Sequence, residues 1–299
     1  YGEFHAERNA ILNCTENTNG ADMYVTLEPC CHYGKTPPCT DIIIKSGIKR
    51  VFIGSSDPNP AVAGKGVKKL RDSGIEVFEN VLKEECDEIN EVFFHYITTG
   101  TPFVAMKYAM TADGKIATRT GKSKWITGEK ARKNVHLSRL RYSAIMVGVG
   151  TVINDDPMLT CRIEQGRNPI RIICDSNLRT PLTSKIIKSA KHVPTIIATC
   201  SSNQKDISEY EKNGCSVITT DSQNGHVDLK NLMERLGKMK IDSILLEGGG
   251  EFNFSAVREG IVQKIECYIA PKIFGGKEAK SPVEGIGVSI PDEAFILNK

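Results

Sequence analysis

The sequence lacks several features that would place the protein in a special class. No apolar run approaches the roughly 20 residues that span a bilayer, which argues against a membrane partner. No signal-peptide pattern opens the printed sequence, so the expected location is cytoplasmic. The formal charge of +3 over 299 residues is too small to favour binding to nucleic acid.

The composition that remains is that of a globular protein large enough for two domains. Hydrophobic residues make up 40% of the chain and charged residues 25%, which is typical of a packed core under a polar surface. We therefore look for two separate patterns of helices and strands.

Cysteine is the residue type that calls for an explanation, because the chain contains ten. In a cytosolic protein, a cysteine cluster is more typical of a metal site than of disulfides. Three cysteines cluster, Cys30, Cys31 and Cys39. The other seven are scattered, and we expect them to be reduced and buried: Cys14, Cys86, Cys161, Cys174, Cys200, Cys215 and Cys267.

Residues 1–98 alternate between helix and strand patterns, which predicts an α/β domain. Helices are expected near residues 5–13, 37–47 and 64–74, and strands at 22–28 and 49–56. Gly47 and Gly74 stand where the last two helices should end in a left-handed cap. Turn residues at 98–102, "TTGTP", indicate a linker.

Residues 102–299 repeat the alternation and predict a second α/β domain with a mainly parallel sheet. Strands are expected at 102–110, 143–150, 169–176, 194–199, 215–220, 242–249 and 264–273. Helices are expected at 128–141, 229–239 and 251–260.

The clustered cysteines, together with a histidine near the chain start, form a candidate zinc site. A catalytic zinc needs three protein ligands and one open position, and His5, Cys30 and Cys39 can supply the three. Pro29 and Pro38 each precede a cysteine at a probable helix start, where the free amides favour a thiolate. A closed structural zinc that also uses Cys31, or no metal at all, are the alternatives.

Glu7 follows His5 at the spacing H-x-E. This pattern, followed by P-C and a later cysteine, is typical of zinc-dependent nucleobase deaminases, in which the glutamate moves protons without binding the metal. Here the second cysteine lies nine positions after the first, whereas the commoner spacing is C-x-x-C. The alternative for Glu7 is a carboxylate on a helix surface.

The segments "HAERNAILN" and "VTLEPCCHYGKTPPCTDIIIKSGIKRVFIGSSDPNPAVAGKG" resemble the deaminase domain of the bifunctional riboflavin-biosynthesis deaminase/reductase family. The resemblance continues through the second half of the chain. It implies a substrate of the diaminopyrimidinone class carrying a ribosylamino 5′-phosphate. The first domain would hydrolyse the ring amine, and the second would reduce the ribosyl group to ribityl with NADPH. His32, Lys35 and Thr36 are candidates to meet the phosphate or base.

The second half contains a glycine-rich turn, "ILLEGGGEFNFS", between a strand and a helix. Such turns present backbone amides to phosphates, but this one is not the G-x-G-x-x-G fingerprint of a dinucleotide-binding Rossmann domain. The resemblance implies instead the fold of dihydrofolate reductase. The segments "KYAMTADGKIAT", "SKWITG", taken as the start of a long helix, and "GVGTVINDDPMLTCR" support this.

The resemblance also implies site residues in the second half. On the cofactor side these are Ala109, Trp125, Thr151, Asp155, Ser176, Gly249, Gly250, Glu251, Phe252, Asn253, Phe254 and Ser255. On the substrate side they are Ser123, Arg139, Leu159, Arg162 and Glu247. We also consider Lys107 for proton supply or for pairing with a phosphate, without assigning it a catalytic role.

Each of these side chains also has an ordinary structural explanation. Trp125 can offer a flat face to a cofactor ring or pack in the core. Arg139 and Arg162 suit a bidentate grip on a phosphate, or they can be surface residues. Glu247 can bind ribose hydroxyls or cap the following helix, while Asp156 is expected in a turn.

Both ends of the sequence suggest a fragment. The chain begins four residues before His5, whereas deaminases of this family have a helix and two strands ahead of that point. "EAFILNK" resembles the start of the closing strands of a reductase sheet. We expect the sequence as printed to be a poor deaminase.

Two other functions remain open. One is a deaminase for free bases or nucleosides that is fused to an unrelated reductase. The other is a non-catalytic zinc-binding module. The resemblance further suggests association of copies through the reductase domain.

Overall fold

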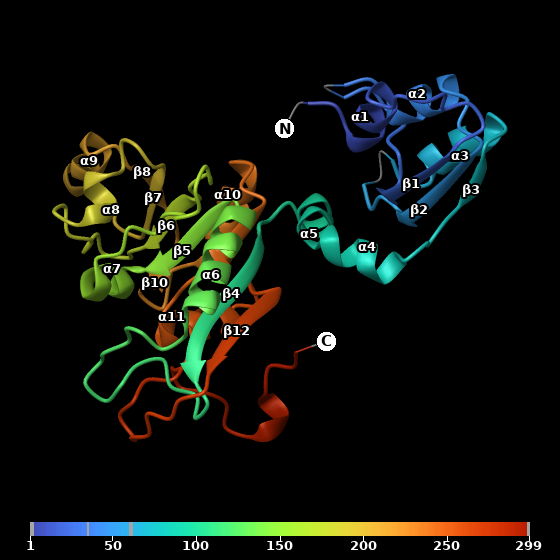
Figure 1. Ribbon diagram of the computed structural model, residues 1–299. Helices are drawn as coiled ribbons and strands as arrows, with labels where there is room; N and C mark the ends of the chain where they lie inside the picture. Colours follow the sequence, from blue (N-terminus) through green and yellow to red (C-terminus); the bar gives the residue numbers. More distant parts are fainter. Residues whose placement is uncertain (1–2, 35, 60–61, 298–299) are drawn as a thin grey trace. The chain divides into compact units, whose positions relative to one another are not determined.

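The chain divides into two units with separate sheets and separate cores (Figure 1). The computed structural model describes residues 3–34, 36–59 and 62–297. The units are Tyr1–Gly100 and Thr101–Lys299. None of the helices among the described residues is long and apolar enough to cross a membrane.

The N-terminal unit is built on three parallel strands in the order β1-β2-β3. Met23, Val51 and Ile53 alternate with outward-facing neighbours and join a core to which Ile43 and Leu70 of two helices also belong. The strands are β1 (Asp22–Leu27), β2 (Arg50–Ser55) and β3 (Glu76–Phe78). The helices are α1 (Ala6–Leu12), α2 (Cys39–Lys45), α3 (Lys65–Asp72), α4 (Lys83–Ile89) and α5 (Glu91–Thr99).

Glycine ends two of these helices as predicted. Gly47 follows α2 with φ +69°, and Gly74 follows α3 with φ +82°, a backbone conformation that residues with a Cβ adopt only with strain. At Gly47 a Cβ would also lie 2.3 Å from Oδ1 of Asn19. These two turns return the chain to β2 and β3.

The C-terminal unit is built on seven strands in the order β12-β4-β11-β5-β6-β7-β8, all parallel. They are β4 (Phe103–Thr111), β5 (Ala144–Gly148), β6 (Ile170–Cys174), β7 (Thr195–Thr199), β8 (Ser216–Thr219), β11 (Ser243–Leu246) and β12 (Lys264–Ala270). A separate antiparallel pair joins β9 (Ser222–Gln223) to β10 (His226–Val227).

Helices cover both faces of this sheet, so its inner strands are apolar on both sides. In β5, Ala144 and Met146 belong to the core beneath α10, whereas Ile145 and Val147 belong to the core that includes α8. The helices are α6 (Glu129–Arg141), α7 (Val149–Asp155), α8 (Lys185–Lys188), α9 (Gln204–Lys212), α10 (Leu229–Lys238) and α11 (Gly250–Arg258), with a short 3-10 helix, η1 (Pro291–Glu293).

Several expectations about the elements were wrong. The apolar run predicted as a strand over 143–150 ends at Gly148, and α7 follows at once. Thr98 and Thr99 belong to α5, so the helix enters the expected linker. Residues 294–297 form no strand, although "EAFILNK" was expected to begin one. Several helices and strands were not predicted at all: β3, α4, α5, α7, α8, α9, β9 and β10.

The expectation for the scattered cysteines was also only partly right. All ten cysteines are free thiols, but of the seven scattered ones only Cys174 and Cys215 are buried. Cys14 and Cys267 are exposed, because Cys14 lies in the turn after α1 and Cys267 lies on the edge strand β12.

Candidate functional site

Three elements of the N-terminal unit bring the predicted zinc ligands together. His5 precedes α1, Cys30 lies in the loop after β1, and Cys39 is the first residue of α2. His5 Nδ1 lies 3.6 Å from Cys30 Sγ and 3.5 Å from Cys39 Sγ. All three donor atoms lie within 4.8 Å of one another.

These separations fit zinc. With bonds of about 2.3 Å to sulfur and about 2.1 Å to nitrogen, tetrahedral donors lie roughly 3.6 Å apart. Two thiols and an imidazole are donors that zinc prefers over the hard, oxygen-binding cations. Cys31 is not part of the group, and among the described residues no other cluster of this kind is found.

Hydrogen bonds already prepare this site for a cation. Cys39 donates two hydrogen bonds to the Cys30 sulfur, one from its thiol and one from its backbone N–H, which lies 3.3 Å away. The thiol bond first, and then the backbone bond, lower the pKa of Cys30 to about 5. The same thiol hydrogen bond raises the pKa of Cys39, because Cys39 is the donor and keeps its proton, and burial raises it further. Cys39 begins α2 as expected, but Cys30 does not begin a helix; its carbonyl accepts the N–H of Thr40.

Glu7 lies in the first turn of α1 and reaches the same place. Its carboxylate is near enough to the Cys39 thiol to hydrogen-bond to it. Burial is the main cause that raises the pKa of Glu7, and the neighbouring Cys30 adds to it. A carboxyl group with a raised pKa beside three metal donors can both accept and donate a proton.

Two buried carboxylates near the site were missed by the sequence analysis. Glu28, 3% exposed, accepts the backbone N–H groups of Gly64, Gly66 and Val67 at 3.0–3.2 Å and so holds the start of α3 against the end of β1. Asp57, after β2, has its pKa raised by burial and by Glu28. Their position in the sequence could have indicated them, because each follows the carboxyl end of a strand and the two strands are parallel neighbours.

The other candidates in this unit are less informative. His32 lies near enough to Asp57 for its charge to lower the pKa of that carboxyl group against the effect of burial. Thr36 is half-buried. Lys35 lies outside the described residues.

In the C-terminal unit, the structure joins Glu247 and Arg139. Glu247 directly follows β11 and accepts two hydrogen bonds from Arg139 of α6, Nε to Oε1 at 2.8 Å and Nη2 to Oε2 at 3.0 Å. The third Arg139 donor, Nη1, binds the Thr160 carbonyl at 3.0 Å. The fork considered for a phosphate is therefore occupied by a carboxylate, and Glu247 caps no helix.

Other charged groups surround this pair. Lys107 Nζ on β4 lies 3.8 Å from Glu247 Oε2. Burial raises the pKa of Glu247, but Arg139 and Lys107 outweigh it and the net shift is downward. Burial lowers the pKa of His136, and Arg139 and Arg162 lower it further. Arg162 itself is exposed and retains the role of a phosphate candidate.

The predicted cofactor residues lie at the carboxyl edge of the sheet, where open parallel sheets bind ligands. Ala109 is near the end of β4, Ser176 follows β6, and Thr151 and Asp155 lie on α7. Gly249 caps α11, and Gly148 caps α7. The two helix starts lie side by side, because a Cβ on Gly148 would lie 3.5 Å from Phe252 in the first turn of α11. A Cβ on Gly249 would meet nothing within 4 Å, so this helix start is open to a ligand.

Not every residue of the glycine-rich turn can present its side chain. Asn253 is fully buried and donates to the Pro282 carbonyl at 2.8 Å. Phe254 is 6% exposed and packs edge-on against Phe295. Leu159, on the substrate side, is buried in the core at φ +51°. Of the non-glycine residues of the turn, Glu251 is exposed and Phe252 and Ser255 are half-buried.

Ser123 and Trp125 lie in the loop before α6, which begins at Glu129 and not at "SKWITG" as expected. The indole is 62% exposed, so the alternative of core packing is not what the structure shows. The Arg132 guanidinium carbon lies 4.7 Å from the ring centre.

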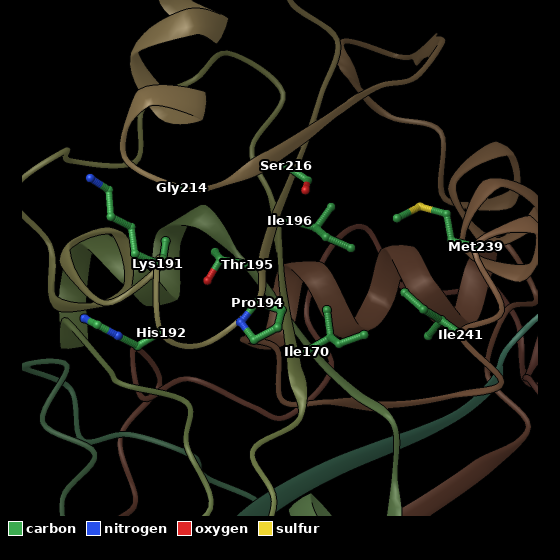
Figure 2. Close-up of a pocket in the computed structure, with 11 residues that line it drawn as sticks. Ile170, Lys191, His192, Pro194, Thr195, Ile196, Gly214, Ser216, Met239 and Ile241 are labelled. Atoms are coloured by element: carbon green, nitrogen blue, oxygen red, sulfur yellow. The ribbon is translucent and has the colours of Figure 1, made fainter. Parts of the chain in front are cut away.

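A cavity of about 410 Å³ lies at the amino ends of the strands, on the side of the sheet away from these residues (Figure 2). Ile170, Thr195 and Ser216, the first residues of β6, β7 and β8, line it together with Lys191. No predicted site residue lines this cavity.

Comparison with known proteins identifies the family. Residues 102–294 match the RibD C-terminal domain, and residues 2–55 match the cytidine and deoxycytidylate deaminase zinc-binding region. The riboflavin biosynthesis protein RibD of Actinobacillus pleuropneumoniae is 57% identical over 296 residues, which are 99% of this chain and 79% of the relative. The chain belongs to the RibD family.

A solved structure agrees with this assignment. The diaminohydroxyphosphoribosylaminopyrimidine deaminase/5-amino-6-(5-phosphoribosylamino)uracil reductase of Thermotoga maritima is 41% identical, with a TM-score of 0.85 over 97% of this chain and 80% of that one. RibD of Acinetobacter baumannii has a TM-score of 0.83 at 33% identity, over 98% and 80% of the two chains.

The RibD family confirms the predicted fold class, a cytidine-deaminase-like domain followed by a dihydrofolate-reductase-like domain. The chain is a bifunctional enzyme of riboflavin biosynthesis with a deaminase and a reductase domain. Its cofactors are Zn²⁺ and NADPH. The fused unrelated reductase and the non-catalytic zinc module are not favoured.

Proposed function

We propose that the N-terminal unit hydrolyses the ring amine of 2,5-diamino-6-(5-phosphoribosylamino)pyrimidin-4-one and that the C-terminal unit reduces the ribosyl group of the product to ribityl phosphate. The Thermotoga maritima relative is named for these two activities. The observation that carries the proposal is the convergence of His5, Cys30 and Cys39 within 4.8 Å, with the Glu7 carboxylate beside Cys39.

In the deaminase unit, His5, Cys30 and Cys39 would hold the zinc ion. When bound, zinc supplies Lewis-acid activation of water near neutral pH. Glu7 would accept the first proton of the attacking water and give it to the ring nitrogen, and would then take the second proton, from the hydroxyl added to the ring, and give it to the departing amine.

In the reductase unit, the open start of α11 at Gly249 and the neighbouring start of α7 suit the phosphates of a dinucleotide. NADPH supplies the hydride when bound. We assign Trp125, Thr151 and Ser176 to the cofactor side of this site, together with Ala109, Asp155 and residues 249–255.

The substrate side of the reductase site is assigned to Ser123, Leu159, Arg162 and Glu247, with Arg139 holding Glu247. Arg139 fixes both oxygens of Glu247, so the carboxylate can accept a hydrogen bond from a ribose hydroxyl only on a remaining lone pair. Arg162, which is exposed, suits the 5′-phosphate.

Glu7→Gln tests the deaminase proposal. We expect ammonia release to fall about 10²–10⁴-fold, the usual contribution of a general acid–base residue, while the zinc content stays the same. NADPH oxidation with the deaminated intermediate should be unchanged. Retained ammonia release in a zinc-loaded Glu7→Gln protein would contradict the assignment of Glu7.

We further propose that the domains are residues 1–98 and 102–299, that the enzyme acts in the cytoplasm, that it binds no nucleic acid, and that copies associate through the reductase unit. The division into units at Gly100 and Thr101 supports the first of these. Limited proteolysis near residue 100 and light scattering of the separate reductase unit test the domain and association proposals.

A further inference from the structure

The loop that carries Ser123 and Trp125 lies beside the segment that follows β12. The loop, residues 112–128, connects β4 to α6, and residues 271–280 leave the neighbouring strand β12 at the same edge of the sheet (Figure 1). Two backbone hydrogen bonds join them, from Ala112 N–H to the Lys272 carbonyl and from Ile116 N–H to the Lys280 carbonyl, both 2.8 Å.

Asp113 adds a side-chain attachment at the start of the loop. Its Oδ1 accepts the Phe274 N–H at 3.2 Å, and its Oδ2 accepts the Gly275 N–H at 2.7 Å. The Thr111 hydroxyl also donates to Oδ1, at 2.6 Å. These bonds, that of Thr111 first, lower the pKa of Asp113 to about 2, so the carboxylate stays charged across the physiological range.

Lys272 attaches the far end of the loop. Its Nζ donates to the carbonyl of Trp125 at 2.9 Å. Arg132, on α6, holds the residues just beyond, since its Nη1 donates to the Thr127 carbonyl at 2.9 Å while its guanidinium group lies over the indole. The Trp125 backbone is therefore held by Lys272, and one face of its ring is covered by Arg132.

An exposed tryptophan on a long loop would ordinarily sample many orientations, and a ligand that stacks on it would have to order the loop on binding. Here the attachments restrict the loop before any ligand arrives. The indole is 62% exposed despite them, so its uncovered surface is available for stacking.

We propose that Lys272 and Asp113 are positioning residues of the reductase site, which hold the Trp125 loop in the orientation that receives the NADPH ring system. The inference rests on the proposed function, in that Trp125 is placed on the cofactor side. Neither residue touches the reacting atoms. Their contribution is to pre-order the loop, so it acts on cofactor affinity and much less on the rate of reduction once the cofactor is bound.

Lys272→Met removes the donor and keeps the length of the side chain. We expect the KM for NADPH to rise about 5-fold, the size expected for one lost hydrogen bond, with kcat nearly unchanged. Trp125 is the only tryptophan, so the steady-state fluorescence anisotropy of the full-length protein reports directly on the loop and should fall. Lys272→Arg should restore both values.

Lys277→Met is the matched control. Lys277 is an exposed lysine of the same segment, for which the described part of the chain shows no hydrogen bond or ion pair. It should leave KM and anisotropy at the parent values. Asp113→Asn is the second variant, since it weakens the attachment without changing Lys272, and it should move the same two readouts in the same direction.

The outcomes distinguish the positioning role of Lys272 and Asp113 from the assignment of Trp125 to the cofactor side. If Lys272→Met and Asp113→Asn both keep the parent anisotropy and the parent KM while their circular dichroism spectra are native, the positioning role is overturned. If Lys272→Met fails to fold, Asp113→Asn alone decides. If NADPH does not quench Trp125 fluorescence in the parent protein, the cofactor-side assignment of Trp125 fails, and the inference fails with it; an anisotropy change would then report a purely structural attachment.

Discussion

Arg139 and Glu247 form a bidentate ion pair although they lie 108 positions apart in the sequence, and both side chains are only 13% exposed. The pair joins α6 to the end of β11, at the place assigned to the reductase substrate. Lys107, 3.8 Å from the carboxylate, adds a second positive charge. The arrangement makes the carboxylate of Glu247 rigid and keeps it ionised.

Arg139→Met should destabilise the reductase unit by about 3 kcal/mol, because it leaves a buried carboxylate without its main partner. Urea unfolding followed by Trp125 fluorescence measures this loss. The double variant Arg139→Met/Glu247→Leu serves as control and should recover part of the stability, since no unpaired charge remains. A double variant no more stable than the single one would show that packing, rather than charge, explains the loss.

The same pair predicts a dependence on pH. The pKa of Glu247 is lower in the folded protein than in the unfolded chain, where it is about 4.3. The ionised carboxylate therefore stabilises the fold fully at pH values above the unfolded-state pKa. This stabilisation is lost as the pH falls through the folded-state pKa. The difference in unfolding free energy between the parent and Glu247→Gln should therefore shrink below pH 4. A difference that stays constant from pH 7 to pH 3 would argue against an ionised, paired Glu247.

Arg171→Met should destabilise the reductase unit more than most single changes. Arg171 lies on β6, is fully buried, and donates to the carbonyls of Ile186 and Val193 and to Thr195 Oγ1, among others. Burial lowers its pKa to about 10, which leaves it charged at neutral pH. We expect a loss of about 3–5 kcal/mol in urea unfolding.

Arg179→Met provides the comparison for Arg171, since Arg179 is exposed. Its unfolding free energy should stay within about 0.5 kcal/mol of the parent. Equal effects of the two substitutions would mean that the buried hydrogen bonds of Arg171 contribute little net stability.

Removal of zinc with a chelator should separate the two activities. His5, Cys30 and Cys39 come from three different elements, so without the ion they lose the bond that joins α1, the β1 loop and α2. Ammonia release should disappear, while NADPH oxidation with the deaminated intermediate should continue, because the cores of the two units are separate. Parallel loss of both activities would show that the reductase unit also depends on the metal.

The strands and the metal donors were the most predictable parts of this protein. Val51, Ile53, Ile145 and Ile172 lie in apolar runs of strand length, and such runs have few ways to be buried other than in a sheet between helices. The convergence of His5, Cys30 and Cys39 was predictable because their residue types and order already restrict the chemistry. Short polar elements such as α4 and β3 were missed, since neither has an apolar run long enough to stand out.

The sequence alone determined the two α/β units, the strand-forming runs and the histidine and cysteines suited to zinc, because these depend on local composition and spacing. Only the tertiary structure decided that Arg139 holds Glu247, that Glu28 holds the start of α3, and that Lys272 holds Trp125. Each of these contacts joins residues at least 36 positions apart. Their partners are selected by how the strands and helices pack, which no local pattern of residues encodes.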